Sequence, residues 1–207
     1  MFDKGGSSPR PASKFITDCL IYKNSKEMAR IIYKDGCEGQ NRLECIEGIE
    51  IGLLNGQKAL VYPKYSEEAL LNIKDRSKCE ADCVTEIEAL RLRDNTEATS
   101  ALVEAGSPAA VFVGGFLSVR FGRFALPTLL AALEITAQKS EIDELAKAID
   151  GADLLEDYSG RVWSCSRYVS GIGWIASGNV GFAIGGNLSV RYVAVPLVLL
   201  DAAAGAA

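Results

Sequence analysis

The chain has 207 residues, and 48% of them are apolar, which is enough to bury a sizeable hydrophobic core. Its 22 Lys and Arg face 27 Asp and Glu, so a net charge of −5 leaves no basic field to attract the backbone of a nucleic acid. Histidine, the commonest general base and metal ligand, does not occur, which excludes most familiar hydrolase and metalloenzyme designs. We therefore expect no nucleic-acid partner, no metal site and no catalysis.

Charge divides the chain into a polar front half and an apolar back half. Residues 1–100 carry 15 basic and 17 acidic side chains, whereas residues 101–207 carry 7 and 10. Residues 1–15 contain two prolines and no apolar periodicity, so they predict a flexible arm without the apolar core of a secretory signal. Either the protein is not exported or its numbering starts after a removed transit sequence. We expect a polar, mainly helical domain over 16–100 and an apolar domain over 101–207.

Apolar spacing predicts three helices in the polar half. The first covers residues 26–34, where Met28, Ile31 and Ile32 fall at helical intervals. Residues 44–54 fit a strand and a helix equally well. An N-cap serine at the start of 66–75 predicts the second helix, and the apolar side of 79–93 predicts the third.

A further helix is predicted in the back half. Ser140 and Asp143 form a variant of the capping box, Ile142 and Ile149 share a face, and Gly151 ends the helix. Together with the polar helices, this pattern predicts an α+β or mostly α fold.

An internal repeat is the most informative feature of the apolar half. Residues 114–121, GGFLSVRF, recur 71 residues later as residues 185–192, GGNLSVRY, with six of eight positions identical. The copies extend over about 105–135 and 176–205, and each contains a proline after the shared motif. If they descend from one unit, they should superpose, with matching contacts to each other or to a partner. The shared positions are Gly114, Gly115, Arg120, Pro127, Gly185, Gly186, Arg191 and Pro196.

The repeats have two interpretations, one of them in a membrane. Residues 168–200 form a 33-residue span whose only charge is Arg191, and about 20 apolar residues suffice to cross a bilayer. Residues 105–133 are a weaker candidate because Arg120 and Arg123 interrupt them, and an arginine at bilayer depth is costly. In this interpretation the back half is embedded in a membrane or contacts one through 105–133 and 168–200.

In the other interpretation each copy folds in water. Six glycines between Tyr168 and Val190 disfavour helix, so each copy would be a buried strand, a Gly-Gly turn, a second strand and a helix opened by proline. The glycine pairs would then lie at positive φ or at a close backbone approach. Each buried arginine would need a polar partner, and the acids between Glu141 and Asp157 are the nearest in sequence.

Six cysteines provide the remaining chemistry. Cys37 and Cys45 would close a loop in an oxidising compartment, whereas Cys79 and Cys83 would share a face of a predicted helix. Neither spacing matches a zinc knuckle, and several of the six are expected to be small buried apolar side chains. If the protein were an enzyme after all, Cys165 would be the candidate nucleophile, because the neighbouring arginine would lower its pKa.

The cysteine-bearing segments resemble a known family. Residues 37–40 (CEGQ), 45–48 (CIEG) and 78–83 (KCEADC) are similar to segments of the gamma-type linker proteins of red-algal phycobilisomes, over about residues 15–95. The resemblance implies a non-enzymatic linker of a photosynthetic light-harvesting assembly, at the chloroplast thylakoid membrane or its surface. It also implies bilin attachment, or chlorophyll contacts, at Cys37, Cys45, Cys79 and Cys83. The apolar back half departs from that family, and a related photosystem accessory subunit would accommodate both halves.

We therefore expect an assembly or linker subunit of a large complex, most simply a light-harvesting or photosystem supercomplex, with other protein subunits as its partners. A virion structural protein is the alternative within this class. A protein that inserts itself into a membrane through its apolar segments is the alternative from another class.

Overall fold

The structure is a computed structural model that describes residues 29–68, 85–154, 161–169, 172–177, 182–187 and 189–200. Helices and strands both contribute to it, so the fold is mixed α+β and the expectation of a mostly helical protein is wrong. The predicted arm and Cys19, Cys79 and Cys83 lie outside the described residues.

Two sheets organise the molecule. The four-stranded sheet is antiparallel throughout and has the order β1 (Arg30–Tyr33), β2 (Ile46–Gly52), β3 (Lys58–Val61) and β11 (Leu197–Leu200). The five-stranded sheet has the order β4 (Ser66–Glu68), β10 (Tyr192–Ala194), β7 (Arg161–Val169), β8 (Ile172–Ser177) and β9 (Phe182–Asn187). Within it, β10 and β7 are the parallel pair.

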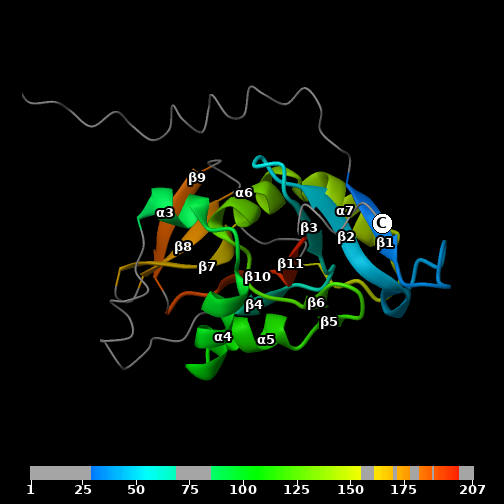
Figure 1. The fold of residues 1–207 in the computed structure, drawn as a ribbon, viewed down its shortest axis with the longest axis horizontal. Helices are drawn as coiled ribbons and strands as arrows, with labels where there is room; N and C mark the ends of the chain where they lie inside the picture. The colour runs from blue at the N-terminus through cyan, green and yellow to red at the C-terminus, as the bar shows by residue number, and fades with distance from the viewer. Residues whose placement is uncertain are drawn as a thin grey trace, which may run out of the picture.

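Five helices cover the sheets in the described part of the chain, together with the short 3-10 helix η1 (Leu43–Cys45) and the small hairpin of β5 (Leu117–Ser118) and β6 (Gly122–Arg123). The helices are α3 (Glu86–Arg91), α4 (Thr96–Glu104), α5 (Pro108–Gly114), α6 (Leu129–Ala137) and α7 (Lys139–Lys147). Figure 1 shows α6 and α7 along one edge of the view, with α4, α5, β5 and β6 along the opposite edge.

The largest core cluster joins both sheets to one helical layer. Ala131 and Ile135 of α6 and Ile142 of α7 pack there with Ile49 of β2 and Val162 of β7, all buried. Alternation along the strands sends their other residues to the opposite face. On that face Trp163 packs under α4 and α5 in a second cluster.

Each sheet combines strands from both halves of the chain. Tyr192 pairs with Glu68 where β10 meets β4, and Leu197 pairs with Val61 where β11 meets β3. The boundary expected near residue 100 is therefore not a boundary between the two sheets.

The polar half is less helical than its periodicity predicts. The segment expected as a helix over 26–34 contains β1 instead, because β-branched Ile31 and Ile32 pair with β2. Residues 46–52 of the ambiguous segment 44–54 form β2. In short segments an apolar spacing satisfies both periods, so pairing with a neighbouring strand decides between them.

The two other helices predicted there have different outcomes. Ser66 is not an N-cap: residues 66–68 form β4 against β10, and residues 69–75 of the predicted helix lie outside the described part. Of the helix predicted over 79–93, residues 86–91 form α3, which begins after Thr85, and residues 79–84 lie outside the described part. Its predicted apolar side is wrong at Ile87, which is 60% exposed, whereas Ala89 is buried. Thr85 and Glu88 form a capping box in which each side chain bonds to the other residue's backbone N–H.

The predicted helix of the back half is confirmed as α7, but its start is different. It begins at Lys139 after Gln138, so Ser140 lies inside it and caps nothing, while Asp143 pairs with Lys139. Ile142 is buried as expected, and Gly151 follows the helix with a φ of +86°.

The two repeat copies do not superpose. The segment before the first Gly pair is helix α5, whereas the second Gly pair lies within strand β9. After Pro127 the chain enters helix α6, but after Pro196 it enters strand β11. The prediction of two equivalent folding units is therefore wrong.

No helix in the described ranges is long and apolar enough to span a membrane. Many apolar side chains of 105–133 and 168–200 belong instead to the core clusters. Val113, Leu126, Trp174 and Ile175 are examples, each almost fully buried.

Candidate functional site

The shared motif of the first copy builds a hairpin at the end of α5. The N–H of Gly115 donates to the carbonyl of Phe112, which ends the helix, and β5 and β6 then pair Leu117 with Arg123. Ser118 Oγ accepts the N–H of Phe121 at 2.8 Å and holds the turn. Nη1 of Arg123 donates to the carbonyl of Gly114 at 2.5 Å, so the hairpin is fastened to the end of the helix.

The inner face of the hairpin is aromatic and packed. Phe124 lies in a cluster with Leu60, on the face of the four-stranded sheet opposite the helices, and Phe116 and Phe121 pack against this cluster. The ring of Tyr62 lies 5.0 Å from that of Phe116 and 5.3 Å from that of Phe124. Burial, assisted by a nearby glutamate, raises the pKa of Tyr62. The hairpin therefore rests on the sheet through its phenylalanines.

The outer face of the hairpin is apolar and exposed. The side chain of Val119 is 84% exposed and that of Leu117 is 64% exposed, and Val111 of α5 and Val103 of α4 are exposed as well. Val103 belongs beside the hairpin, because its Cγ2 lies 3.7 Å from where a Cβ on Gly114 would be. We call Val103, Val111, Leu117 and Val119 the hairpin surface.

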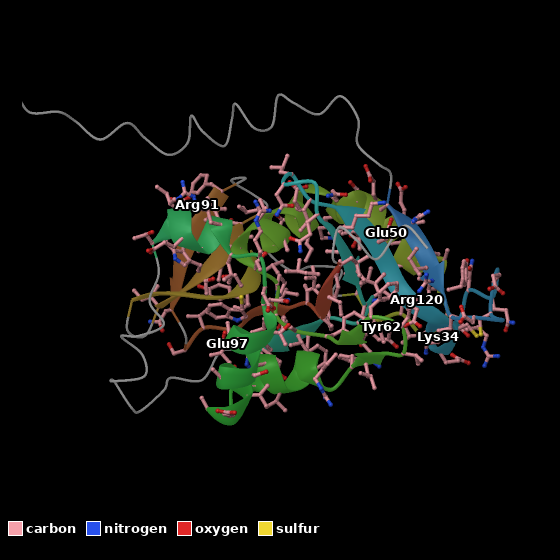
Figure 2. All side chains as sticks on the ribbon, viewed as in Figure 1. Lys34, Glu50, Tyr62, Arg91, Glu97 and Arg120 are labelled. Atoms are coloured by element: carbon pink, nitrogen blue, oxygen red, sulfur yellow. The ribbon has the colours of Figure 1, made fainter. Side chains whose placement is uncertain are left out.

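Two exposed arginines border this surface. Arg123 contacts the end of α5, and the guanidinium of Arg120 lies 5.2 Å above the ring of Phe121. Figure 2 shows Arg120 at the same end of the molecule as Lys34 and Tyr62. Because Arg120 is exposed, it does not need the buried polar partner expected for it, and the same holds for exposed Arg191 in the second copy.

The second copy shares only the turn. The N–H of Val190 donates to the carbonyl of Asn187 at 3.0 Å, and the Asn187 side chain accepts the N–H of Ser189. Val190 is exposed, as Val119 is in the first copy. Val and Arg of the common letters S-V-R are therefore exposed in both copies, whereas Ser118 is buried, Ser189 is exposed, and the flanking elements differ.

The glycine pairs fulfil their expected role at one position. A Cβ on Gly186 would lie 2.9 Å from Cε2 of Tyr192 and 3.0 Å from Cγ2 of Ile175, so no side chain fits. Gly115, by contrast, has a φ of −72°, and Gly114 has room for a Cβ. Gly185 is exposed in β9.

The proline segments are where the two copies meet. Ala125 and Leu197 exchange backbone hydrogen bonds of 2.9 and 3.0 Å. The carbonyl of buried Pro127 accepts the N–H of Cys165, and that of buried Pro196 accepts the N–H of Tyr62. The carbonyls of both prolines thus bond to strands of the two sheets.

The structure brings two of the predicted cofactor cysteines together. Cys37 and Cys45 are free thiols on one loop, and the interaction with the neighbouring Cys45 thiol, more than burial, raises the pKa of Cys37 above its usual 9.0. Cys165, the nucleophile considered for an enzyme, is buried, and desolvation raises its pKa to about 12. It is therefore protonated at neutral pH and a poor nucleophile. Within the described ranges no three His, Cys, Asp or Glu side chains are placed to hold a metal ion.

Sequence reasoning missed the hairpin surface. It treated Leu117 and Val119 only as members of an apolar repeat, although they alternate with Phe116 and Ser118 as strand residues do. That alternation, followed by Gly122, was the available signal for a hairpin with one exposed face.

Comparison with known proteins gives no relative of this chain: no protein-family model, no curated protein and no solved structure matches it.

Proposed function

We propose that this protein is a non-enzymatic subunit of a large protein assembly and that it binds a neighbouring subunit through the hairpin surface. The proposal rests on the contrast between the two faces of the hairpin, one packed and one exposed. Its phenylalanines are packed on the sheet, while Leu117 and Val119 are exposed on the other side.

Burial of these exposed apolar side chains by a partner would be energetically favourable. Burying a leucine or valine side chain contributes about 2 kcal/mol, and clustered exposed apolar residues mark interaction sites. The packed inner face and the hydrogen bond of Arg123 to α5 hold the hairpin in place before binding, so little conformational entropy is lost on docking. An apolar partner surface bordered by acidic groups would also match Arg120 and Arg123.

The type of assembly rests on the cysteine-bearing segments. Their similarity to gamma-type linkers supports a light-harvesting or photosystem supercomplex at the thylakoid membrane or its surface. Residues 37–40 lie in the loop between β1 and β2, and residues 45–48 lie at the end of η1 and in the first part of β2, whereas residues 78–83 lie outside the described part of the chain.

The test is sedimentation of native particles from cells that produce the tagged full chain. We expect the wild-type chain to sediment with a large particle, and a Leu117→Ser, Val119→Ser double variant to shift to the fractions of a free protein. Ile87→Ser is the matched control, because Ile87 is 60% exposed but lies on α3, and it should stay with the particle.

Circular dichroism and thermal melting should be unchanged for all three chains, since none of the substituted side chains is buried. Recovery of the wild-type chain as a free, monodisperse monomer would overturn the proposed function. A double variant that still sediments with the particle would show that the contact lies elsewhere.

A further inference from the structure

In the loop between β1 and β2, the backbones of two cysteines hydrogen-bond to the same residue, Lys34. Lys34 donates its N–H to the carbonyl of Cys45 at 3.0 Å and accepts the N–H of Cys37 at its own carbonyl, also at 3.0 Å. Gly36, just before Cys37, and Gly39, shortly after it, each have a φ of +77°, and these left-handed residues let the chain turn on both sides of Cys37. The backbone of the loop therefore holds Cys37 and Cys45 on opposite sides of the same short turn.

The side chains of this loop lie close together. Sγ of Cys45 donates to Oε1 of Gln40 at 3.6 Å, and the N–H of Gln40 is bound to the carbonyl of Cys37 at 3.0 Å. The Cys45 thiol is also near enough to that of Cys37 to raise its pKa. Because both cysteines lie on this one short loop, a disulfide between them needs only a local adjustment of the loop.

The two thiols differ in access. Cys37 is half-buried, so a reagent in solution can reach it, whereas Cys45 is buried behind it. An accessible thiol next to a buried one is the arrangement of an attacking cysteine with a resolving cysteine. Cys165 cannot compete, because it is buried in the cluster under α4 and α5.

The rest of the loop is anchored independently of the cysteines. The N–H of Leu43 donates to the carbonyl of Asp150, and the N–H of Asp150 donates to the carbonyl of Asn41, both at 2.8 Å. These bonds tie the loop to the chain that follows α7. The positions of the two thiols are therefore set by the fold and not by the sulfur atoms alone.

We infer that Cys37 and Cys45 are a redox pair that forms an intramolecular disulfide by exchange with a small-molecule disulfide. The Cys37 thiolate attacks one sulfur of the small disulfide and releases one small thiolate, which leaves a mixed disulfide on Cys37. The Cys45 thiolate then attacks the Cys37 sulfur and releases the second small thiol. Both cysteines are oxidised, the small disulfide is reduced to two thiols, and these thiols carry the two protons that the protein loses.

The test uses glutathione disulfide as the oxidant on the reduced full chain. After equilibration at mildly alkaline pH, free thiols are alkylated and the chain is digested with trypsin. Cleavage after Lys34, Arg42 and Lys58 places the two cysteines on separate peptides, residues 35–42 and 43–58. We expect these two peptides to be joined, with the mass of their sum less two hydrogen atoms.

Variants distinguish a specific reaction of the Cys37–Cys45 pair from the general reactivity of thiols. In Cys45→Ser, Cys37 should instead retain glutathione as a mixed disulfide, because the resolving thiol is missing. Cys165→Ser should join the same two peptides as the wild-type chain. In the oxidised wild-type chain the thermal midpoint should rise by roughly 5 °C, since the bond restricts the unfolded chain, and this rise should be absent from Cys45→Ser.

The raised pKa of Cys37 adds a kinetic expectation. Because the pKa of the Cys37 thiol is raised, little thiolate is present at neutral pH, and exchange should become faster as the pH is raised from 7 toward 9. Three results would overturn the inference: recovery of both peptides alkylated, glutathione on both cysteines of the wild-type chain, or joining of either peptide to another cysteine.

Discussion

Gly48 lies in β2 where the strand passes under Leu60 of β3. Its φ of +155° lies at the edge of the range that favours glycine, and the register of β1 and β2 shifts beside it, between Ile32 and Tyr33. A Cβ at this position would lie 2.7 Å from the carbonyl oxygen of Val61 and 2.8 Å from Cγ of Leu60. The position therefore excludes every side chain.

We predict that Gly48→Ala lowers the free energy of unfolding by about 1–3 kcal/mol, because either β2 or β3 must move. Gly52→Ala is the matched control, since Gly52 lies in the same strand with nothing within 4 Å of its Cβ position, and its effect should be below about 0.5 kcal/mol. Urea denaturation of both variants measures the difference. Equal losses in the two variants would contradict the assignment of the effect to the contact with β3.

At the scale of single elements, three of the five described helices begin at a residue whose side chain caps them, and α4 and α7 do not. Thr85 opens α3, Ser107 opens α5 with a proline behind it, and Thr128 opens α6. In each case the side-chain oxygen accepts a backbone N–H three residues later. Each of these caps joins residues within one helical turn of each other. A cap is therefore recognisable from the sequence, provided that the right residue is taken as the N-cap.

Thr128 and Ser140 give a direct comparison of a cap with an apparent cap. Oγ1 of buried Thr128 accepts the N–H of Ala131 at 3.3 Å, so Thr128→Ala should lower the free energy of unfolding by about 1 kcal/mol. Ser140→Ala should be neutral or slightly stabilising, because Ser140 lies inside α7 and alanine is the better helix former. Thermal or urea unfolding of the two variants measures both changes in the free energy of unfolding. A loss at Ser140 as large as that at Thr128 would restore Ser140 as the cap.

The repeat shows how far the secondary structure of a segment depends on the segments that precede it and pack beside it. Before the first Gly pair, Ser107 and Pro108 open a helix, and alanines follow. Before the second Gly pair there is no such opening, and β9 instead pairs residue by residue with β8, from Ser177 with Phe182 to Ile172 with Asn187. Similar apolar letters therefore become helix in one copy and strand in the other.

At the scale of the whole molecule, the front and back halves complete each other's sheets. Without residues 1–100, β10 and β11 would lose the neighbours β4 and β3, and Leu197 and Val193 would lose part of the largest core cluster. Without the back half, β2 and β3 would lose the buried faces of α6 and α7. The largest core cluster is therefore shared by the two halves, whereas the buried residues of the cluster under α4 and α5 all come from the back half.

We therefore predict that fragments 1–100 and 101–207 do not fold when each is produced alone, because strand pairing and core packing would both be incomplete. Each should lack a cooperative thermal transition and dispersed amide proton shifts, while the full chain shows both. Mixing the two fragments is the control, and it should restore a cooperative transition if they recombine. A fragment 101–207 that folds alone would support an independent apolar domain.

The candidate site depends partly on local interactions and partly on contacts with residues that are distant in sequence. The S-V-R turn is local, since Ser118 bonds to Phe121 within the motif, and the exposed turn recurs where the motif recurs. Which face of the hairpin is covered depends on Leu60 and Tyr62, which lie far from it in sequence. For this reason the exposure of Leu117 and Val119 could not be read from the apolar repeat.

Taken by itself, the sequence predicted a helix at α7 and one that includes α3, because apolar periodicity acts over a few residues, but it placed the start of neither helix correctly. Only the tertiary structure decided that residues 30–33 and 66–68 are strands, since their partners are Glu50 in one case and Tyr192 in the other. A strand gains its hydrogen bonds from another segment, whereas a helix makes them within itself. Short apolar segments of this chain therefore take the structure that their distant neighbours can pair with.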